Sequence, residues 1–422
     1  MLDIKFLEEN REYAIKQLNK RNADFTKIIN DILKENAERK LTISKLETLK
    51  SEKNKLTKSI SELMRNKDVS GVNKVKSEVE KSSKTIGTLE GTLKKIEFSL
   101  NEKLISVPNI PNKDIPIGVN EEQNIEVRKY NEEGNVSRET PHWDIATKLG
   151  LVDFGIGPKL SGSRFLVYTG KGSKMVRALA DILLNHHTNN GYREMFVPVI
   201  VNPEAMYGTG QLPKFGDDAY KLENGQYLIP TSEVPLSNIY ANEFIDEKLL
   251  PIKLTAFTQC FRKESGSAGR DTKGMIRLHQ FNKVELVKMT RPEDSMKELE
   301  LMVGDAEAIL KLFKLPYRVV ELCSGDIGFS SLKTYDLEVW FPEQNKYREI
   351  SSCSNCGDFQ AMNMKTKFKN SEGKAQYVHT LNGSGVAIDR LFAAILENYF
   401  DGEKLVLPDV LKPYFNNEKF IK

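Results

Sequence analysis

Residues Thr26–Glu97 contain neither proline nor an aromatic residue, and their apolar side chains recur at spacings of three and four. One apolar series runs from Leu46 to Leu63 and a second from Val72 to Leu100, with the turn-forming segment Asn66–Gly71 between them. The pattern predicts two long helices packed antiparallel as a coiled coil. A helix of about 40 residues rises about 60 Å, so the pair would form an extended helical hairpin that buries its own apolar seam.

The predicted helical hairpin is basic. Residues 27–97 hold 17 Lys and Arg against 11 Asp and Glu, whereas the whole chain carries a net charge of only +3. A basic surplus on one element indicates a polyanionic partner, and the lack of aromatic residues favours recognition of duplex shape over base stacking. An isolated coiled coil is more often an oligomerisation zipper, but a hairpin that satisfies its own seam leaves its outer faces for such a partner.

A segment rich in Pro and Asn, residues 106–134, predicts the boundary between two domains, 1–106 and 107–422. No apolar run approaches the roughly 20 residues of a membrane helix, and the first residues lack the pattern of a signal peptide. The four cysteines suggest no disulfide framework. We therefore expect a cytoplasmic protein with no membrane partner.

In the second part of the chain, two alternating segments, Leu254–Lys263 and Met275–Lys288, flank a loop rich in Gly and Ser and predict a β-hairpin. A period of two would place these mostly polar side chains on one face of its second strand: Arg277, His279, Phe281, Lys283 and Glu285. A purely structural strand would put apolar residues there, so this face is predicted to bind a ligand. The alternative is a solvated amphipathic hairpin. Three glycines would let the loop fold over a ligand: Gly266, Gly269 and Gly274.

The remaining elements predicted around this β-hairpin are both helices and strands. The expected helices are Met175–Asn190, Leu299–Phe313 and Val386–Tyr399. The expected strands are Glu194–Val201, Tyr335–Phe341, Tyr347–Ser352 and Lys374–Leu381, with Asn382–Gly385 as a loop before the last helix.

The β-hairpin carries a motif. Phe261-Arg262-x-Glu264, followed by Gly274-Met275-x-Arg277-x-His279-Gln280-Phe281-x-Lys283-x-Glu285, resembles motif 2 of class II aminoacyl-tRNA synthetases in its seryl version. The resemblance to bacterial-type seryl-tRNA synthetases covers essentially the whole chain, with motif 1 at about 175–201, motif 2 at about 254–288 and motif 3 at about 377–399. It implies an α+β fold with an antiparallel sheet flanked by helices, an N-terminal antiparallel two-helix coiled-coil arm, and a homodimer.

The resemblance also implies an activity. Such an enzyme activates L-serine with ATP to seryl-adenylate and pyrophosphate, with Mg²⁺, and then transfers serine to the 3′ end of tRNA(Ser). The sequence leaves open whether tRNA(Sec) is a second substrate. The basic arm would bind the tRNA, and the sequence leaves open whether it serves its own or the partner subunit.

Site residues follow from the motifs by resemblance. Three are expected to be catalytic: Arg262, Glu349 and Arg390. The serine pocket would comprise Thr231, Ser232, Glu233, Arg262, Glu285 and Ser384. ATP would contact Arg262, Lys263, Glu264, Arg277, Phe281, Glu349, Ile350, Ser351, Ser352 and Arg390, with Phe281 stacked on adenine. The metal ligands would be Glu349 and Ser352.

A departure from the family pattern stands next to Arg390. Asp389 stands where the family usually has a small residue, and it would pair with Arg390 or face solvent. Two rival interpretations are a synthetase-derived tRNA-binding protein and an amino acid:carrier protein ligase. The first would be expected to lack Arg262, Glu349 or Arg390, and the second has no use for a basic arm.

Overall fold

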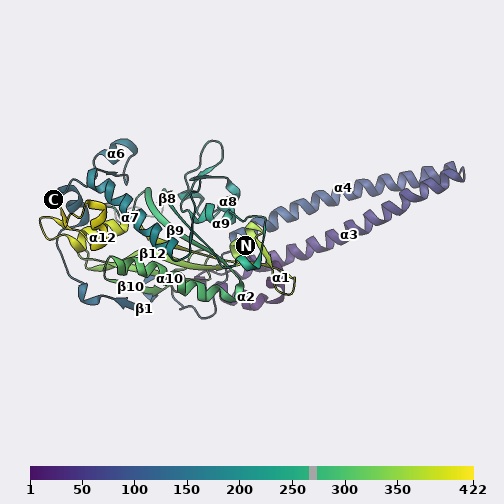
Figure 1. Cartoon of the computed structure of the whole chain (residues 1–422). Helices are drawn as coiled ribbons and strands as arrows, with labels where there is room; N and C mark the ends of the chain where they lie inside the picture. Colours follow the sequence, from purple (N-terminus) through teal and green to yellow (C-terminus); the bar gives the residue numbers. More distant parts are fainter. Residues whose placement is uncertain (266–272) are drawn as a thin grey trace. The chain divides into compact units, whose positions relative to one another are not determined.

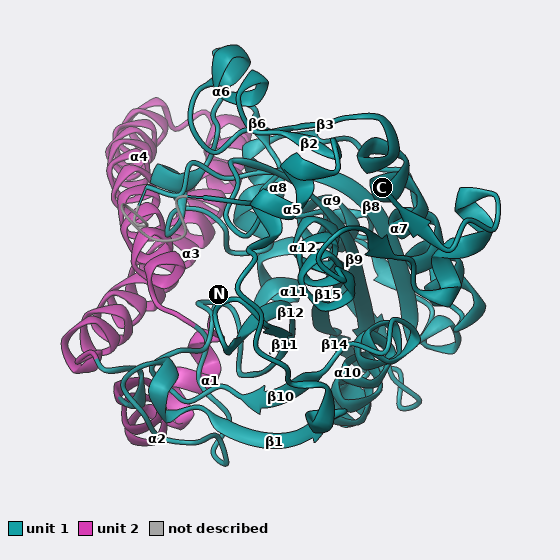
Figure 2. Ribbon diagram, turned by 90° about the vertical axis from the view of Figure 1, so that its left-hand side faces the viewer, with its two compact units in different colours: residues 1, 20–22, 109–422 teal, residues 2–19, 23–108 magenta. Residues whose placement is uncertain are grey.

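A computed structural model of the chain describes residues 1–265 and 273–422, which form two compact units (Figure 2). Unit 1 comprises Met1, residues 20–22 and residues 109–422, and unit 2 comprises residues 2–19 and 23–108. Two of the glycines expected in the loop of the β-hairpin, Gly266 and Gly269, lie outside the described residues. Among the described helices, none has the length and apolar character needed to cross a bilayer.

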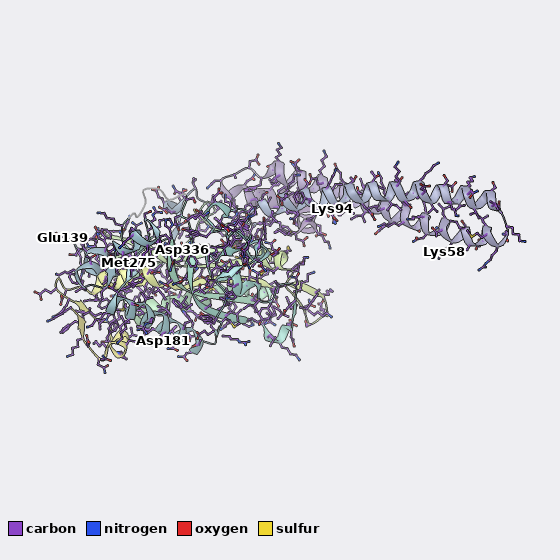
Figure 3. All side chains as sticks on the ribbon, turned by 90° about the horizontal axis from the view of Figure 1, so that it is seen from above. Lys58, Lys94, Glu139, Asp181, Met275 and Asp336 are labelled. Atoms are coloured by element: carbon purple, nitrogen blue, oxygen red, sulfur yellow. The ribbon has the colours of Figure 1, made fainter. Side chains whose placement is uncertain are left out.

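Unit 2 is dominated by the helices α3, Thr26–Arg65, and α4, Val69–Ser106, which lie antiparallel along each other (Figure 1). The predicted seam is confirmed, because every one of its apolar side chains is buried or half-buried along both helices. Ion pairs such as Lys50–Glu90 (2.7 Å) also join the two helices. Two short helices precede them, α1 (Ile4–Glu9) and α2 (Arg11–Leu18). Lys58 and Lys94, both labelled in Figure 3, belong to the basic surface of the pair.

Unit 1 is built on an eight-stranded sheet with the order β1-β10-β11-β12-β15-β9-β8-β4. All neighbouring strands pair antiparallel except β4 and β8. In sheet order the strands are β1 (Ile125–Tyr130), β10 (Tyr317–Glu321), β11 (Lys333–Phe341), β12 (Lys346–Gly357), β15 (His379–Ala387), β9 (Gln280–Thr290), β8 (Ile252–Phe261) and β4 (Arg193–Glu194). The antiparallel sheet with helices and the helical hairpin confirm the predicted fold class.

Three amphipathic helices, α7 (Gly170–Asn189), α10 (Ser295–Leu312) and α12 (Ile388–Tyr399), bury their apolar faces in the core that includes the sheet. The shorter helices are α5 (His142–Lys148), α6 (Ile156–Ser161), α8 (Pro203–Gly208), α9 (Glu233–Asn238) and α11 (Phe359–Met364). Small sheets are formed by β2 (Val152–Asp153) with β3 (Val167–Tyr168), β5 (Ile200–Val201) with β6 (Tyr227–Leu228), β7 (Phe244–Ile245) with β13 (Lys367–Lys369) and β14 (Ala375–Tyr377), and β16 (Leu405–Val406) with β17 (Phe420–Ile421).

The predicted β-hairpin exists, but its second strand begins later than expected. Strand β9 starts at Gln280, so Arg277 and His279 precede the strand and do not share its regular alternation. Gly274, at a φ of 81°, belongs to the bends that lead into it.

Two other predicted strands are wrong in extent. The expected strand Glu194–Val201 is split into β4 and β5, which belong to different sheets. The expected strand Lys374–Leu381 is divided between β14 and β15, which also belong to different sheets. The expected loop Asn382–Gly385 is instead the middle of β15, and the helix that follows begins at Ile388. Strands β11 and β12, in contrast, are neighbours as predicted.

Candidate active site

Two adjoining cavities open in unit 1. The large cavity has a volume of about 480 Å³ and the small cavity about 70 Å³. Five charged side chains line both: Arg262, Glu264, Arg277, Glu349 and Arg390. They come from the two arms of the β-hairpin, from strand β12 and from helix α12, which are far apart in the chain. The fold therefore gathers three guanidinium groups and two carboxylates at one place.

Each arginine is held by a definite contact. The Nε of Arg262 donates to the carbonyl of Pro230 (3.2 Å), and its guanidinium lies 5.1 Å from the centre of the Phe281 ring. Arg277 donates to the carboxylate of Glu264 (2.7 Å). Arg390 donates to the carbonyl of Glu349 (2.7 Å) and lies 3.3 Å from its carboxylate. The charge of Arg390 lowers the pKa of Glu349, which keeps this carboxylate ionised.

A buried polar cluster adjoins the cavities. The hydroxyl of Thr231 donates to the carboxylate of Glu285 (3.0 Å) and accepts from the Nζ of Lys283 (2.9 Å), which also forms an ion pair with Glu285. Lys283 lines the small cavity and covers the buried Glu285. The sequence placed Lys283 on the polar face but assigned it no role.

A second carboxylate, Glu233, lines the large cavity. It accepts hydrogen bonds from the side-chain amides of Gln360 (2.7 Å) and Asn382 (3.0 Å), neither of which sequence reasoning identified. Gln360 lies on α11 and no motif marks it, whereas Asn382 directly precedes the Gly-Ser-Gly run of motif 3. Burial, together with the nearby charge of Glu285, raises the pKa of Glu233 to about 7.

Strand β12 supplies the expected metal ligands. Glu349 and Ser352 are three positions apart, so on a regular strand their side chains would face opposite sides of the sheet. The register between β11 and β12 shifts next to Ile350, however. Both side chains consequently line the large cavity. Asp336 pairs with Ser352 across the strands, and its buried Oδ1 has no hydrogen-bond partner among the described residues. The carboxylate of Glu349 and the hydroxyl of Ser352 are oxygen donors, the kind of donor that Mg²⁺ binds.

Some expected site residues do not line either cavity. Thr231, Ser232 and Glu285 are buried, and so is Ser351, whose hydroxyl donates to the carbonyl of Ser384 (2.5 Å). Lys263 is exposed, with its Nζ 5.8 Å from the centre of the Tyr220 ring. Three other expected site residues do line the small cavity: Phe281, Ile350 and Ser384.

Neither environment expected for Asp389 is correct. Its side chain is only 2% exposed, so it does not face solvent. The carboxylate is directed away from pairing with Arg390, because it accepts from the hydroxyl of Tyr168 and from the main-chain N–H (2.5 Å) and side-chain amide (3.2 Å) of Asn282.

Comparison with known families gives two matches, one in the N-terminal part of the chain and one in the second part. The family model of the seryl-tRNA synthetase N-terminal domain matches residues 1–111, and that of the tRNA synthetase class II core domain (G, H, P, S and T) matches residues 219–399.

Full-length relatives agree with these matches. The chain is 61% identical over 421 residues to the serine–tRNA ligase of Mesoplasma florum, with 100% of both chains covered. It is 46% identical to that of Staphylococcus saprophyticus over 427 residues, covering 100% of this chain and 99% of the relative. The crystal structure of seryl-tRNA synthetase from Pyrococcus horikoshii complexed with ATP superposes with a TM-score of 0.91 at 34% identity, covering 100% of this chain and 99% of that one. The chain belongs to the seryl-tRNA synthetase family of class II aminoacyl-tRNA synthetases.

Proposed function

We propose that this chain ligates serine to tRNA(Ser) in two steps, activation of L-serine by ATP and transfer of the seryl group to the 3′ end of the tRNA. The observation that carries the proposal is the convergence of Arg262, Arg277 and Arg390 on adjoining cavities, next to a buried cluster of hydrogen-bonding groups. The full-length identity to curated serine–tRNA ligases supports the same activity.

In the first step the serine carboxylate attacks the α-phosphorus of ATP, and the bond to pyrophosphate breaks. Negative charge on phosphate oxygens must be stabilised, which preorganised guanidinium groups do effectively. We assign Arg262, which lines both cavities, to the α-phosphate and the serine carboxylate, and Arg277 and Arg390 to the outer phosphates. Phe281, which lines the small cavity beneath Arg262, is the platform for adenine.

Magnesium would be held by Glu349 and Ser352. When bound, Mg²⁺ neutralises phosphate charge and orients the leaving pyrophosphate. The shifted register that turns both side chains into the large cavity supports this assignment.

Serine would be selected by buried polar groups. We propose that Thr231, Ser232, Glu233, Glu285 and Ser384 form the pocket for its amine and hydroxyl. A pocket whose polar groups are left unpaired by alanine rejects that analogue by up to roughly 10⁴–10⁵.

The proposal is tested by aminoacylation. The purified chain, ATP, Mg²⁺ and labelled serine should charge a tRNA(Ser) transcript, whereas a transcript of another tRNA should stay uncharged. A protein that binds tRNA(Ser) without charging it would fit the synthetase-derived binding protein instead. Transfer of serine to a carrier protein would fit the alternative ligase.

The raised pKa of Glu233 predicts a pH dependence for serine binding. A neutral Glu233 cannot pair with the substrate ammonium, so the KM for serine should rise by about tenfold per pH unit below about pH 7. The value of kcat should change little, because the chemical step does not use this group. Steady-state exchange measured from about pH 6 to about pH 8 checks this. In Glu233→Gln the KM should be high and independent of pH, and a flat wild-type profile would remove Glu233 from the amine site.

The basic helical hairpin of α3 and α4 is proposed to bind the tRNA. Residues 1–106 would form the tRNA-binding domain and residues 107–422 the catalytic domain.

We place the enzyme in the cytoplasm, because its four cysteines are free, as expected in a reducing compartment.

We also propose a homodimer with an interface near motif 1. Phe196, between β4 and β5, is 99% exposed, and Ile200, the first residue of β5, is 43% exposed. Large apolar side chains so exposed next to the edge strand of a sheet indicate a partner surface.

This interface makes a direct prediction. Phe196→Asp should convert the dimer to a monomer in sedimentation velocity experiments, since a charge would be buried without a partner. The matched control is Ile125→Asp, which alters an apolar side chain that is 53% exposed on β1, at the opposite edge of the sheet. If Phe196→Asp sediments like the wild type while Ile125→Asp dissociates, the interface lies elsewhere.

A further inference from the structure

We propose that helix α12 acts as a clamp that holds residues 275–282 in position to bind ATP, and that His142, Glu397 and Asp389 are positioning residues for this segment. The inference rests on the proposed function for the identity of the ligand. It concerns His142 and Glu397, which the sequence did not mark, and Asp389, for which it predicted other surroundings.

The segment needs support from outside the sheet. Pairing of β9 with β8 begins only at Gln280, so the residues before it lack a regular ladder of hydrogen bonds. Yet Arg277 and Phe281, which we assign to the phosphates and to adenine, lie in this segment and line the small cavity. A misplacement of about 1 Å in such groups can cost a hundredfold in rate.

The first point of the clamp is Met275 (labelled in Figure 3). Its main-chain N–H donates to the Nε2 of His142 (3.1 Å), which is fully buried. Because Nε2 accepts, the Nδ1 of His142 carries the proton and donates to the carboxylate of Glu397 on α12 (2.7 Å). Glu397 also accepts from the main-chain N–H of His142 (3.1 Å) and of Glu343 (3.1 Å), which fixes its orientation.

The close approach of the chain to His142 depends on Gly274. A Cβ at this position would lie 2.2 Å from the Nε2 of His142, and the φ of 81° also disfavours any other residue. The glycine that sequence analysis linked to loop closure therefore lets the segment reach its first anchor.

The second and third points lie one after the other on α12. The Nε of Arg390 donates to the carbonyl of Ile276 (3.2 Å). Asp389, the residue before it, binds the main-chain N–H of Asn282 (2.5 Å), between Phe281 and Lys283. The hydroxyl of Tyr168 donates to the same carboxylate and completes its set of partners.

These contacts tie the two ends of residues 275–282 to the helix that also carries Arg390. Disturbing the clamp should therefore weaken ATP binding. Serine binding should change far less, because Thr231, Glu233 and Ser384 lie on other segments and Glu285 is paired within the sheet on both sides.

The test measures the two ligands separately. In His142→Ala and Asp389→Ala, the Kd for ATP, from calorimetry without amino acid, should rise about tenfold to hundredfold. The KM for serine at saturating ATP should stay within about twofold of the wild type. Glu397→Gln and Asp389→Asn preserve volume, so they keep the test usable if the alanine variants fold poorly. Their effect should have the same direction and be smaller.

The control is Glu307→Gln. Glu307 is a buried carboxylate on α10 that pairs with Arg128 (2.7 Å) and Tyr317 (2.8 Å), away from both cavities. It should lower the melting temperature without changing the affinity for ATP. If the clamp variants lose affinity for ATP and serine equally, or only lose stability as Glu307→Gln does, the positioning role is wrong.

A double-mutant cycle separates positioning from general damage. If His142 acts through Arg277, the effect of His142→Ala on ATP binding should shrink in the Arg277→Ala background, whereas independent effects would multiply fully. Serine activation by the wild type distinguishes a failure of the clamp proposal from a failure of the proposed function. If it activates serine while the clamp variants bind ATP normally, only the clamp is wrong. If it activates no amino acid, the proposed function fails first.

Discussion

Replacing Arg262 with alanine is expected to lower serine-dependent ATP–pyrophosphate exchange by about a thousandfold. Arg262 lines both cavities and lies over the Phe281 ring, and we propose that its guanidinium serves both the α-phosphate and the serine carboxylate. Its loss removes charge stabilisation that is strongest in the transition state, and kcat should therefore fall more than the KM values rise.

Two further variants sharpen this prediction. Arg262→Lys keeps the charge but loses the planar fork, and it should recover only part of the rate. Arg318→Ala removes an arginine that pairs with Glu338 and Glu126 on the sheet, outside the residues that line the cavities. It should exchange pyrophosphate within about twofold of the wild type. An Arg262→Ala enzyme with nearly normal exchange would place the chemistry elsewhere.

The second large effect is expected from shortening the helical hairpin. We would delete residues 46–89 and join Lys45 to Glu90 with a short flexible turn. This keeps the base of the hairpin, where Ile29, Ile32 and Leu100 are buried. Serine activation should stay within about twofold of the wild type, because every expected site residue lies beyond residue 230. Charging of tRNA should fall at least about a hundredfold, because several phosphate contacts are lost.

The salt dependence of tRNA binding identifies the cause of that loss. Replacing the outward lysines Lys58, Lys74, Lys76 and Lys81 with glutamine should reduce the slope of log K against log salt by about 0.9 for each phosphate contact removed. Loss of affinity with an unchanged slope would show that these lysines do not contact phosphates. If the shortened enzyme charges tRNA normally, the tRNA-binding site does not lie on the hairpin.

The helical hairpin could be predicted from the sequence because its order is local. Spacings of three and four fix which side chains meet, and both helices lie on either side of a short turn. The polar turn correctly predicted where the chain reverses direction between the two helices, although α4 already begins at Val69, inside the expected turn.

Two strand predictions were wrong in extent, one at a run of glycines and one at an exposed apolar residue. The glycines of Asn382–Gly385 were interpreted as a loop, but a Cβ on Gly383 would lie 2.8 Å from the sulfur of Met302, and one on Gly385 would lie 2.6 Å from the Nε2 of His187. They permit close packing within strand β15. The predicted strand Glu194–Val201 includes Phe196, but Phe196 is exposed and lies between β4 and β5, outside both strands.

The charged residues of the site could be located by motif, but their neighbours could not. The partners of Asp389 are Tyr168 and Asn282, each more than 100 positions away, and no local pattern indicates that they meet. Gln360 and His142 were missed for the same reason. Such contacts depend on how the sheet and its surrounding helices are brought together, which no short stretch of sequence encodes.

The central claim, that this site activates serine and no other amino acid, is tested most directly by ATP–pyrophosphate exchange measured separately with each of the twenty amino acids. We predict exchange with serine alone, with alanine and glycine rejected for lack of a hydroxyl and threonine for lack of room. Rejection of alanine should reach roughly 10⁴ or more, because it would leave buried polar groups such as Thr231 and Glu285 unpaired. Exchange that depends equally on alanine, or that occurs with no amino acid, would contradict the account.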